Sequence, residues 1–337
     1  MTAQTHARMK VVFIGLISLL TLSAFSATAR PPHPMIAYRL GPLGGPFHLY
    51  TMDIDGSDVR QLTDAPEFSY FDWSPDGTRL VLASFQGWLA TIGCDGSSLQ
   101  PLPLGAIAFP AAPAWSPDGT EIAFQGVAAG QNVDIFVLTL TSGNVRKLTD
   151  HGRNDEHPTW SPDGKWIAFT SNRDPNFWLH DLNGELIGLT RDIYLMDTDG
   201  NHLQNLTQHP ADDHFPAWSP DGRQIAFVRR GLDTQPHIHL LDVSGGSIRR
   251  LTNFNKDKVH HVGWSPDSQQ LIFDLRNTEE VRSDIYVMDR QGNKLRQLTH
   301  SDPGILANSP SWFGIGLNVS PVGLKQTVWG EVKQDKE

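Results

Sequence analysis

Trp160-Ser161-Pro162-Asp163-Gly164 is one copy of a five-residue phrase that decides the fold of this chain. Further copies of WSPDG begin at Trp73, Trp115 and Trp218, and altered copies are WSPDS at Trp264 and Pro-Ser-Trp ending at Trp312. The gaps between successive tryptophans are 42, 45, 58, 46 and 48 residues. A repeat of this period fits one four-stranded blade of a β-propeller better than it fits the shorter helical repeats.

Each copy is followed by the same order of turn and strand signals. Proline fixes φ and glycine tolerates positive φ, so the chain reverses at the phrase into an apolar run such as residues 122–124. A run rich in aromatic and β-branched residues comes next, as at 193–197, and is typical of a strand. A glycine turn then leads to an outer strand that ends in Leu-Thr, as at Leu206-Thr207. Each repeat therefore predicts four strands.

The two ends of the repeat region complement each other. The first repeat has a second strand at 35–39, a third and a fourth, but no first strand that carries a tryptophan. Trp312 ends a first strand and has no recognisable second strand after it. We expect residues 309–312 to pair with residues 35–39, which closes the ring and leaves no long unpaired edge. The predicted fold is all-β, a six-bladed β-propeller of four-stranded blades, closed by pairing of the N- and C-terminal strands in blade one.

The ordered set P-x-W-S-P-D-G, I-A-F, D-I-Y-x-M-D, D-G and L-T resembles the repeat of the TolB-like, WD-repeat-like β-propeller family. The resemblance covers about Met35 to Trp312. It implies a propeller fold and, as a function, partner binding at the cell envelope. We expect no N-terminal α/β domain of the kind one family member carries, because too few residues lie between residue 30 and the first blade. Function still has to be argued from a site, since one fold supports many functions.

The amino end predicts export. Arg8 and Lys10 precede an apolar stretch at 11–22, and small residues end at Ala29, which are the three parts of a secretory signal. We expect a signal peptide at 1–29, cleaved near Ala29, a propeller at 30–313 and a tail of unknown role at 314–337. The mature protein would be periplasmic or secreted. The alternative is an uncleaved anchor at 11–29, although serine, threonine and glycine dilute its hydropathy.

Charge and motifs narrow the function classes. The net charge is −10, and loss of a signal that holds Arg8 and Lys10 makes the chain more acidic, which disfavours nucleic acid and anionic lipid as partners. The single cysteine, Cys94, cannot form an internal disulfide. The sequence contains no G-x-S-x-G, H-E-x-x-H or G-x-x-x-x-G-K motif. We therefore expect a non-enzymatic monomer with no stable membrane span after signal cleavage.

The candidate site is one mouth of the central channel. The first strand of each blade lines the channel, so side chains shortly before each tryptophan should surround that mouth. One half of this ring is apolar or small, and the other half is rich in histidine and acid. A long loop between Phe169 and Asp192 would add an exposed aromatic side chain above it. The predicted ligand-binding residues are Asp155, Glu156, His157, Asp212, Asp213, His214, His260, His261, Asn308 and Trp178.

Two functions remain open for this site. The first is an exported, non-catalytic protein-binding or scaffold module at the bacterial cell envelope, which needs no cofactor. The second is a metal-dependent polysaccharide lyase, because oligogalacturonate lyases resemble this chain in their repeats and hold a His-ligated metal at the channel. Glu156, His157, His214, His260 and His261 could imitate that divalent-cation site. A structural role is the bland alternative, since aspartate and histidine before a strand often bond loop backbone.

Overall fold

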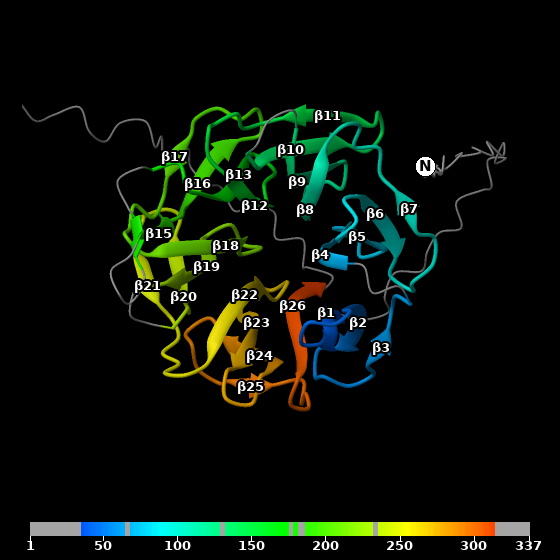
Figure 1. Ribbon diagram of the computed structural model, residues 1–337, viewed down its shortest axis with the longest axis vertical. Helices are drawn as coiled ribbons and strands as arrows, with labels where there is room; N and C mark the ends of the chain where they lie inside the picture. Colours follow the sequence, from blue (N-terminus) through cyan, green and yellow to red (C-terminus); the bar gives the residue numbers. More distant parts are fainter. Residues whose placement is uncertain are drawn as a thin grey trace, which may run out of the picture.

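The protein is a ring of β-sheets whose innermost strands face a common centre (Figure 1). The computed structural model describes residues 35–64, 68–128, 132–174, 178–180, 186–231 and 235–313, with backbone only for 178–180 and 186–189. Every regular element in these ranges is a strand. None of the described ranges holds a helix long and apolar enough to cross a membrane. The predicted signal peptide, 1–29, and tail, 314–337, lie outside the described residues.

Four of the sheets have four strands each. In order from the channel outward they are β4 (Phe68–Trp73), β5 (Arg79–Ser84), β6 (Leu89–Gly93), β7 (Gln100–Pro101); β8 (Ala108–Trp115), β9 (Glu121–Val127), β10 (Asp134–Thr139), β11 (Asn144–Lys147); β12 (Asp155–Trp160), β13 (Trp166–Ser171), β16 (Asp192–Asp197), β17 (Gln204–Asn205); and β18 (Asp212–Trp218), β19 (Gln224–Arg230), β20 (His237–Asp242), β21 (Ile248–Arg250). A small hairpin of β14 (Trp178–His180) and β15 (Leu186–Leu189) is inserted before β16. The β-propeller architecture is thus confirmed.

The predicted count of six separate four-stranded blades is wrong. Beyond the four blades above, the remaining strands form one eight-stranded sheet. Its members are β22 (Lys258–Trp264), β23 (Gln270–Asn277), β24 (Arg282–Asp289), β25 (Arg296–Gln297), β26 (Ile305–Phe313), β1 (Met35–Pro42), β2 (His48–Asp53) and β3 (Arg60–Gln61).

A short segment before β26 fuses the two halves of that sheet. Ser301 Oγ donates to Ser283 O at 3.1 Å, and Gly304 N donates to Val281 O at 3.1 Å. These bonds hold the segment beside the start of β24, where Ser283 pairs in parallel with Leu306. The acceptors in these bonds are backbone carbonyls, so the residue types at these positions do not predict the fusion.

The ring is closed by strands from opposite ends of the chain. β26 pairs antiparallel with β1, from Met35 opposite Phe313 to Pro42 opposite Ile305. Figure 1 shows the two strands side by side, one red and one blue. The pairing removes two edges that would otherwise be exposed for association with other chains.

The repeated phrase makes the same turn in each copy that has an Asp. The Ser hydroxyl donates to the Asp carboxylate two residues later, for example Ser161 to Asp163 at 2.6 Å. The residue after the Asp has positive φ, 69° at Gly164 and 60° at Ser268, where glycine is normally favoured. Apolar side chains after the turn, such as Phe124, Phe169, Phe227 and Phe273, are fully buried and form the packing between neighbouring sheets.

Candidate functional site

The innermost strands share a bulge near the third residue before the tryptophan. The register shifts between Glu156 and Thr159 in β12, and between His214 and Ala217 in β18. Within or next to such shifts, φ is +53° at His157 and +54° at Phe215, which is unusual for residues other than glycine. A bulge changes the direction of a side chain, and strained backbone of this kind gathers at functional sites. We define the channel mouth as the end where these strands begin, and the turn side as the end with the WSPDG turns.

Four side chains from four different sheets meet across the channel. The Phe215 ring centroid lies 4.3 Å from that of His157 and 4.5 Å from that of His261. The Tyr70 ring lies 5.8 Å from His157 and 6.3 Å from His261. We call Tyr70, His157, Phe215 and His261 the ring cluster. It narrows the channel just inside the mouth.

His157 is held neutral within the ring cluster. Burial lowers the pKa of its imidazole well below the ordinary value, and the charges of His214, His261 and Arg191 lower it further. Gln125 of the neighbouring sheet accepts the backbone N–H of His157 at 2.9 Å. His157 is thus placed by a side chain from a different sheet and acts as an uncharged ring.

Asp274 organises the histidines of β22. Its Oδ1 accepts His261 N at 3.1 Å and lies 2.9 Å from His261 Nδ1, while its Oδ2 lies 3.4 Å from His260 Nδ1. The carboxylate is 1% exposed. Burial raises its pKa, but the charge of His261 and the hydrogen bonds from both histidines outweigh this and keep the pKa well below its ordinary value. An ionised Asp274 therefore orients two of the predicted ligand residues.

A second charged group lies on the adjoining sheets. His214 Nε2 is 2.7 Å from Asp212 Oδ2, and Arg191 Nε donates to Glu156 Oε2 at 3.2 Å. Arg191 also lies 3.5 Å from Asp212. Burial raises the pKa of Asp212, but His214 and Arg191 outweigh it and lower the pKa overall. The side chains of Glu156, Arg191, Asp212 and His214 thus form one network of ion pairs at the mouth.

Two predicted ligand residues are buried in ion pairs of their own. Asp213 accepts two hydrogen bonds from Arg229, both at 2.7 Å, and Asp155 accepts one from Arg173 at 2.7 Å. Both carboxylates are 0% exposed. Burial raises the pKa of Asp213 to about 6, although Arg229 opposes the shift. Asp155 and Asp213 therefore each hold an arginine inside the protein, and their carboxylates are not open to solvent.

The other predicted residues lie in different settings. His260 is the most open of the histidines at the mouth, with a side chain 40% exposed. Asn308 has a buried Oδ1 without a hydrogen-bond partner among the described residues. The side chain of Trp178 lies outside the described residues. Their role in ligand binding stays a prediction.

Tyr70 and Phe215 are among the side chains that the sequence placed around the mouth, but they were not among the predicted ligand-binding residues, and Arg191 and Asp274 were missed. Tyr70 and Phe215 stand three places before a tryptophan, as His157 and His261 do, so their position was a usable signal. Asp274 follows an apolar run at the place where the other repeats have Arg39, Ala83, Gln125, Thr170 or Val228. Burying a carboxylate within a strand costs free energy unless a partner pairs with it, so an acid at this place in the repeat could have indicated a paired site.

Exposed aromatic side chains lie beside the mouth on the opposite half of the ring. Phe85, in the hairpin between β5 and β6, is 65% exposed, and Phe109, at the start of β8, is 74% exposed. The Arg39 guanidinium lies 4.6 Å from the Phe47 ring centroid and 6.0 Å from that of Phe85. The mouth thus has an apolar half and a charged half.

A metal centre does not fit the side chains described at the mouth. Within the described ranges, no group of three or more His, Cys, Asp or Glu side chains could hold a metal ion. Glu156 Oε2 is bonded to Arg191 and His261 Nδ1 lies against Asp274, so His261 could offer a metal only its Nε2.

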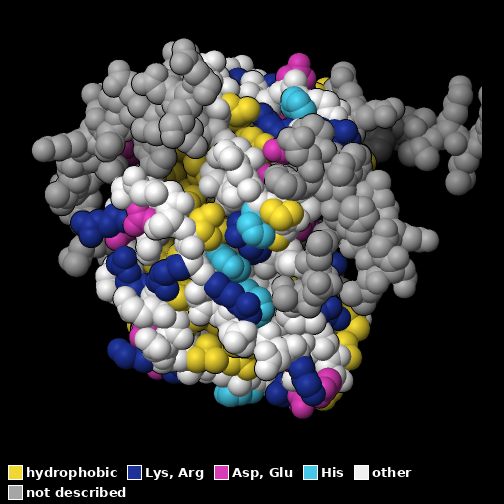
Figure 2. Space-filling model, turned by 90° about the vertical axis from the view of Figure 1, so that its left-hand side faces the viewer, with side chains coloured by type: hydrophobic (Ala, Val, Ile, Leu, Met, Phe, Trp, Pro, Cys, Tyr) yellow, Lys and Arg dark blue, Asp and Glu magenta, His cyan; other side chains and the backbone are white. Residues whose placement is uncertain are grey.

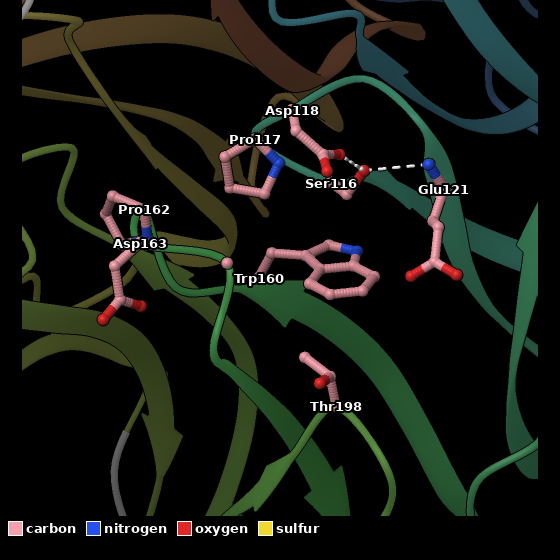
Figure 3. Close-up of a pocket in the computed structure, with 9 residues that line it drawn as sticks. Ser116, Pro117, Asp118, Glu121, Trp160, Pro162, Asp163 and Thr198 are labelled. Carbon is pink, nitrogen blue, oxygen red and sulfur yellow. Dashed lines mark hydrogen bonds between the residues drawn. The ribbon is translucent and has the colours of Figure 1, made fainter.

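Two hollows lie away from the mouth. One, with a volume of ≈270 Å³, continues the channel below the ring cluster and reaches Asp72, Trp218, Trp264 and Trp312. The other, of ≈380 Å³, lies on the turn side beside Trp160, Glu121 and Thr198 (Figure 3). In the second hollow Asp118 accepts from Ser116 at 2.7 Å, so these polar groups build the turn itself.

The family comparison agrees with the repeat and the fold. The family described as "TolB beta propeller domain" matches residues 36–187 and 185–319. The chain belongs to this TolB beta propeller domain family. Its match includes all the sheets that form the mouth.

Individual relatives of this TolB-type propeller are distant. The Tol-Pal system protein TolB of Francisella tularensis subsp. mediasiatica is 26% identical over 281 residues, covering 79% of this chain and 59% of that protein. The crystal structure of TolB from Acinetobacter baumannii superposes with a TM-score of 0.68 at 22% identity, covering 82% of this chain and 66% of that chain. An oligogalacturonate lyase in complex with manganese gives a TM-score of 0.55 at 16% identity, covering 78% and 73%. The two structural similarities concern the fold alone.

Proposed function

We propose that this chain is an exported, non-catalytic TolB-type propeller that binds a protein partner at the cell envelope through its channel mouth. The family match and the name of the Francisella relative, a Tol-Pal system protein, support this proposal. The signal sequence expected at 1–29 supports a periplasmic or secreted location. The chain spans 59% of that relative's length, so the role is proposed for the propeller only.

The observation that carries the proposal is the pairing of a preorganised polar group with exposed aromatics around one opening. His214 and His261 are each paired at 2.7 and 2.9 Å with a buried aspartate, and His260 lies 3.4 Å from the second of these, so little side-chain entropy is lost when a partner contacts them. Phe85 and Phe109 offer apolar area next to them. Protein interfaces combine aromatic anchors with a polar rim in this way.

The lyase alternative has less support from the donor set. Glu156, His214 and His261 each contact a charged partner within the protein. A histidine that contacts a carboxylate through one ring nitrogen can still bind a metal through the other, so the weaker support rests on the donors not being grouped: no three of them come together among the described residues.

Site-specific photo-cross-linking in the native envelope tests the proposal. A photoreactive phenylalanine replaces Phe85 or Phe109 at the mouth, and Leu203 or Leu295 on the turn side serves as the matched control, with 44% and 50% exposure. We expect one discrete protein adduct from the mouth positions and none from the control positions. Equal adducts from both sides, or none from the mouth, would contradict the assignment.

A double variant tests the polar half of the mouth. His214→Ala with His260→Ala should remove the adduct formed from Phe109, because both imidazoles would lose their contact with the partner. His202→Ala changes a 75% exposed histidine in the turn after β16 and should leave the adduct unchanged. Thermal melting must show that the double variant is folded.

A further inference from the structure

The cavity below the ring cluster carries a single aspartate. Its wall includes Asp72 from β4, and it also includes prolines that stand two places before a tryptophan and tryptophans of the repeat: Pro113, Pro158, Pro216, Pro310, Trp218, Trp264 and Trp312. At the residue before each tryptophan, where Asp72 stands, the other inner strands have Ala114, Thr159, Ala217, Gly263 and Ser311. Asp72 is therefore the one carboxylate among the described residues that line the cavity, whose other polar lining residues are Tyr70, His157, Thr159, His261, Ser309 and Ser311.

Asp72 differs from the acids at the mouth in its partners. Asp155, Asp212, Asp213, Glu156 and Asp274 all lie next to an arginine or a histidine. Among the residues that the structure describes, Asp72 has no such cationic partner; its Oδ2 accepts the backbone N–H of Trp115 at 2.9 Å. Burial raises the pKa of this carboxyl to about 7, against the opposing hydrogen bonds from Trp115 and Trp73. When Asp72 is ionised, backbone N–H groups contact its carboxylate, but no cationic side chain among the described residues balances its charge.

The chemistry of such a cavity suits one class of ligand. A carboxylate taken out of water gains most from a cation placed against it. Aromatic faces attract an organic cation and also shield its methylene or methyl groups from water. A volume of ≈270 Å³ has room for a small ammonium ion or for the end of one long side chain.

We propose that this cavity binds an organic cation, an ammonium or guanidinium group, with Asp72 as its counter-ion. The ring cluster narrows the mouth side, so the ligand enters from the turn side. The cation is either a free small molecule or the side chain of a lysine or arginine on another protein. This site adjoins the partner surface proposed above and shares His261 with it, whereas Asp72 belongs to the cavity alone.

Calorimetric titration of the purified protein tests the proposal. The probes are choline, Nα-acetyl-lysine amide and Nα-acetyl-arginine amide, and the neutral carbon isostere of choline is the matched control. We expect saturable binding with a stoichiometry of one for at least one cation and no binding of the isostere. Binding of choline alone indicates a free small molecule, whereas binding of an amide alone indicates a protein side chain.

Two variants locate the site. Asp72→Asn should weaken cation binding by at least about tenfold, the loss expected for a charge-assisted contact. Asp58→Asn removes the same charge from an exposed position, with a side chain 44% exposed, and should bind as the wild type does. If Asp72→Asn fails to melt cooperatively, Thr159→Leu on the cavity wall takes its place, since its added bulk should exclude the ligand.

Each outcome decides the question. Absence of saturable binding by all three cations, equal binding of the isostere, or unchanged affinity in a folded Asp72→Asn protein would overturn the proposal. The photo-cross-link from Phe109 should persist in Asp72→Asn, so failure of the cation site and failure of the partner surface are distinguishable.

Discussion

His261 Nδ1 lies 2.9 Å from Oδ1 of Asp274, so a fully buried carboxylate holds one ring of the cluster that narrows the channel. The same oxygen accepts Ser309 N at 3.4 Å, from the strand that closes the ring. The side chain of Asp274 therefore links β22, β23 and β26. Its interaction with His261 connects the geometry of the mouth to the stability of the fold.

Replacing Asp274 by alanine should destabilise the protein by about 3 kcal/mol, because the donors of His261 and Ser309 lose a buried acceptor. Urea unfolding at pH 7.5 measures the loss. Asp58→Asn should unfold at the wild-type urea concentration, because Asp58 forms a surface ion pair with the exposed Arg60. A wild-type midpoint for Asp274→Ala would contradict this account.

The same carboxylate predicts a loss of stability in strong acid. Its folded pKa lies below its unfolded value, so its contribution is complete above the unfolded pKa of about 4 and is lost as the pH falls toward the folded value. Asp274→Asn should therefore show a flatter dependence of unfolding free energy on pH below about 4 than the wild type. An equal slope in the two proteins would remove Asp274 as the cause.

Two histidines of β20, in the outer part of the ring, predict a second loss of stability, which occurs at mildly acidic pH. β20 lies at the left of Figure 1, and Figure 2 shows histidine side chains beside lysine and arginine on that side. Burial lowers the pKa of both His237 and His239 to about 4, and Arg250 contributes to this, with its Nη2 2.5 Å from His237 Nε2. The unfolded chain binds more protons between pH 6.5 and about 4, so stability should fall as the pH is lowered through this window.

Urea midpoints at pH 7.5 and pH 5 check this effect. His239→Gln should reduce the difference between the two midpoints, whatever it does to the midpoint at pH 7.5. A difference that survives in His239→Gln at full size would assign the effect to other groups.

The sequence allowed the strands and turns to be predicted because the phrase W-S-P-D-G encodes local geometry. Ser161 and Asp163 bond within the turn, so no distant contact is needed to form it. The fused eight-stranded sheet could not be predicted in this way, because Ser301 and Gly304 bond to backbone carbonyls. Backbone acceptors are the same in every residue, so they leave no pattern in the sequence.

The candidate site was predictable only at the level of which segments meet. Asp155 and His157 are two residues apart, yet Asp155 is buried against Arg173 while His157 turns into the ring cluster. The bulge between Glu156 and Thr159, which contains His157, decides this, and it depends on how β12 pairs with β13. Residue type and spacing do not report that register.

The strained backbone of the bulges predicts a contrast between two alanines of β8. Ala112 has φ of +46°, so Ala112→Gly relieves strain that offsets the entropy cost of glycine. Ala114, on the same strand, does not have positive φ, so Ala114→Gly should lose stability through the entropy cost of glycine with no relief of strain. We expect Ala112→Gly to be more stable than Ala114→Gly by about 1 kcal/mol in urea unfolding. The reverse order would show that the bulge is unstrained.

Closure of the ring by β26 predicts the effect of truncation. A chain that stops after Gly304 lacks the β26 partners of β1 from Met35 to Pro42, so that β1 keeps only β2 as a neighbour and the buried side chains of Ile36 and Ala37 become exposed. We expect it to aggregate or to melt without cooperativity, because an unpaired edge invites association. A chain that stops after Phe313 keeps the whole of β26, including the contact of Phe313 with Trp73 at 5.3 Å between ring centroids, and should melt as cooperatively as the full chain. Scanning calorimetry compares the three proteins, and a cooperative transition in the shorter truncation would mean that the remaining sheets hold together without the strand that joins the two ends.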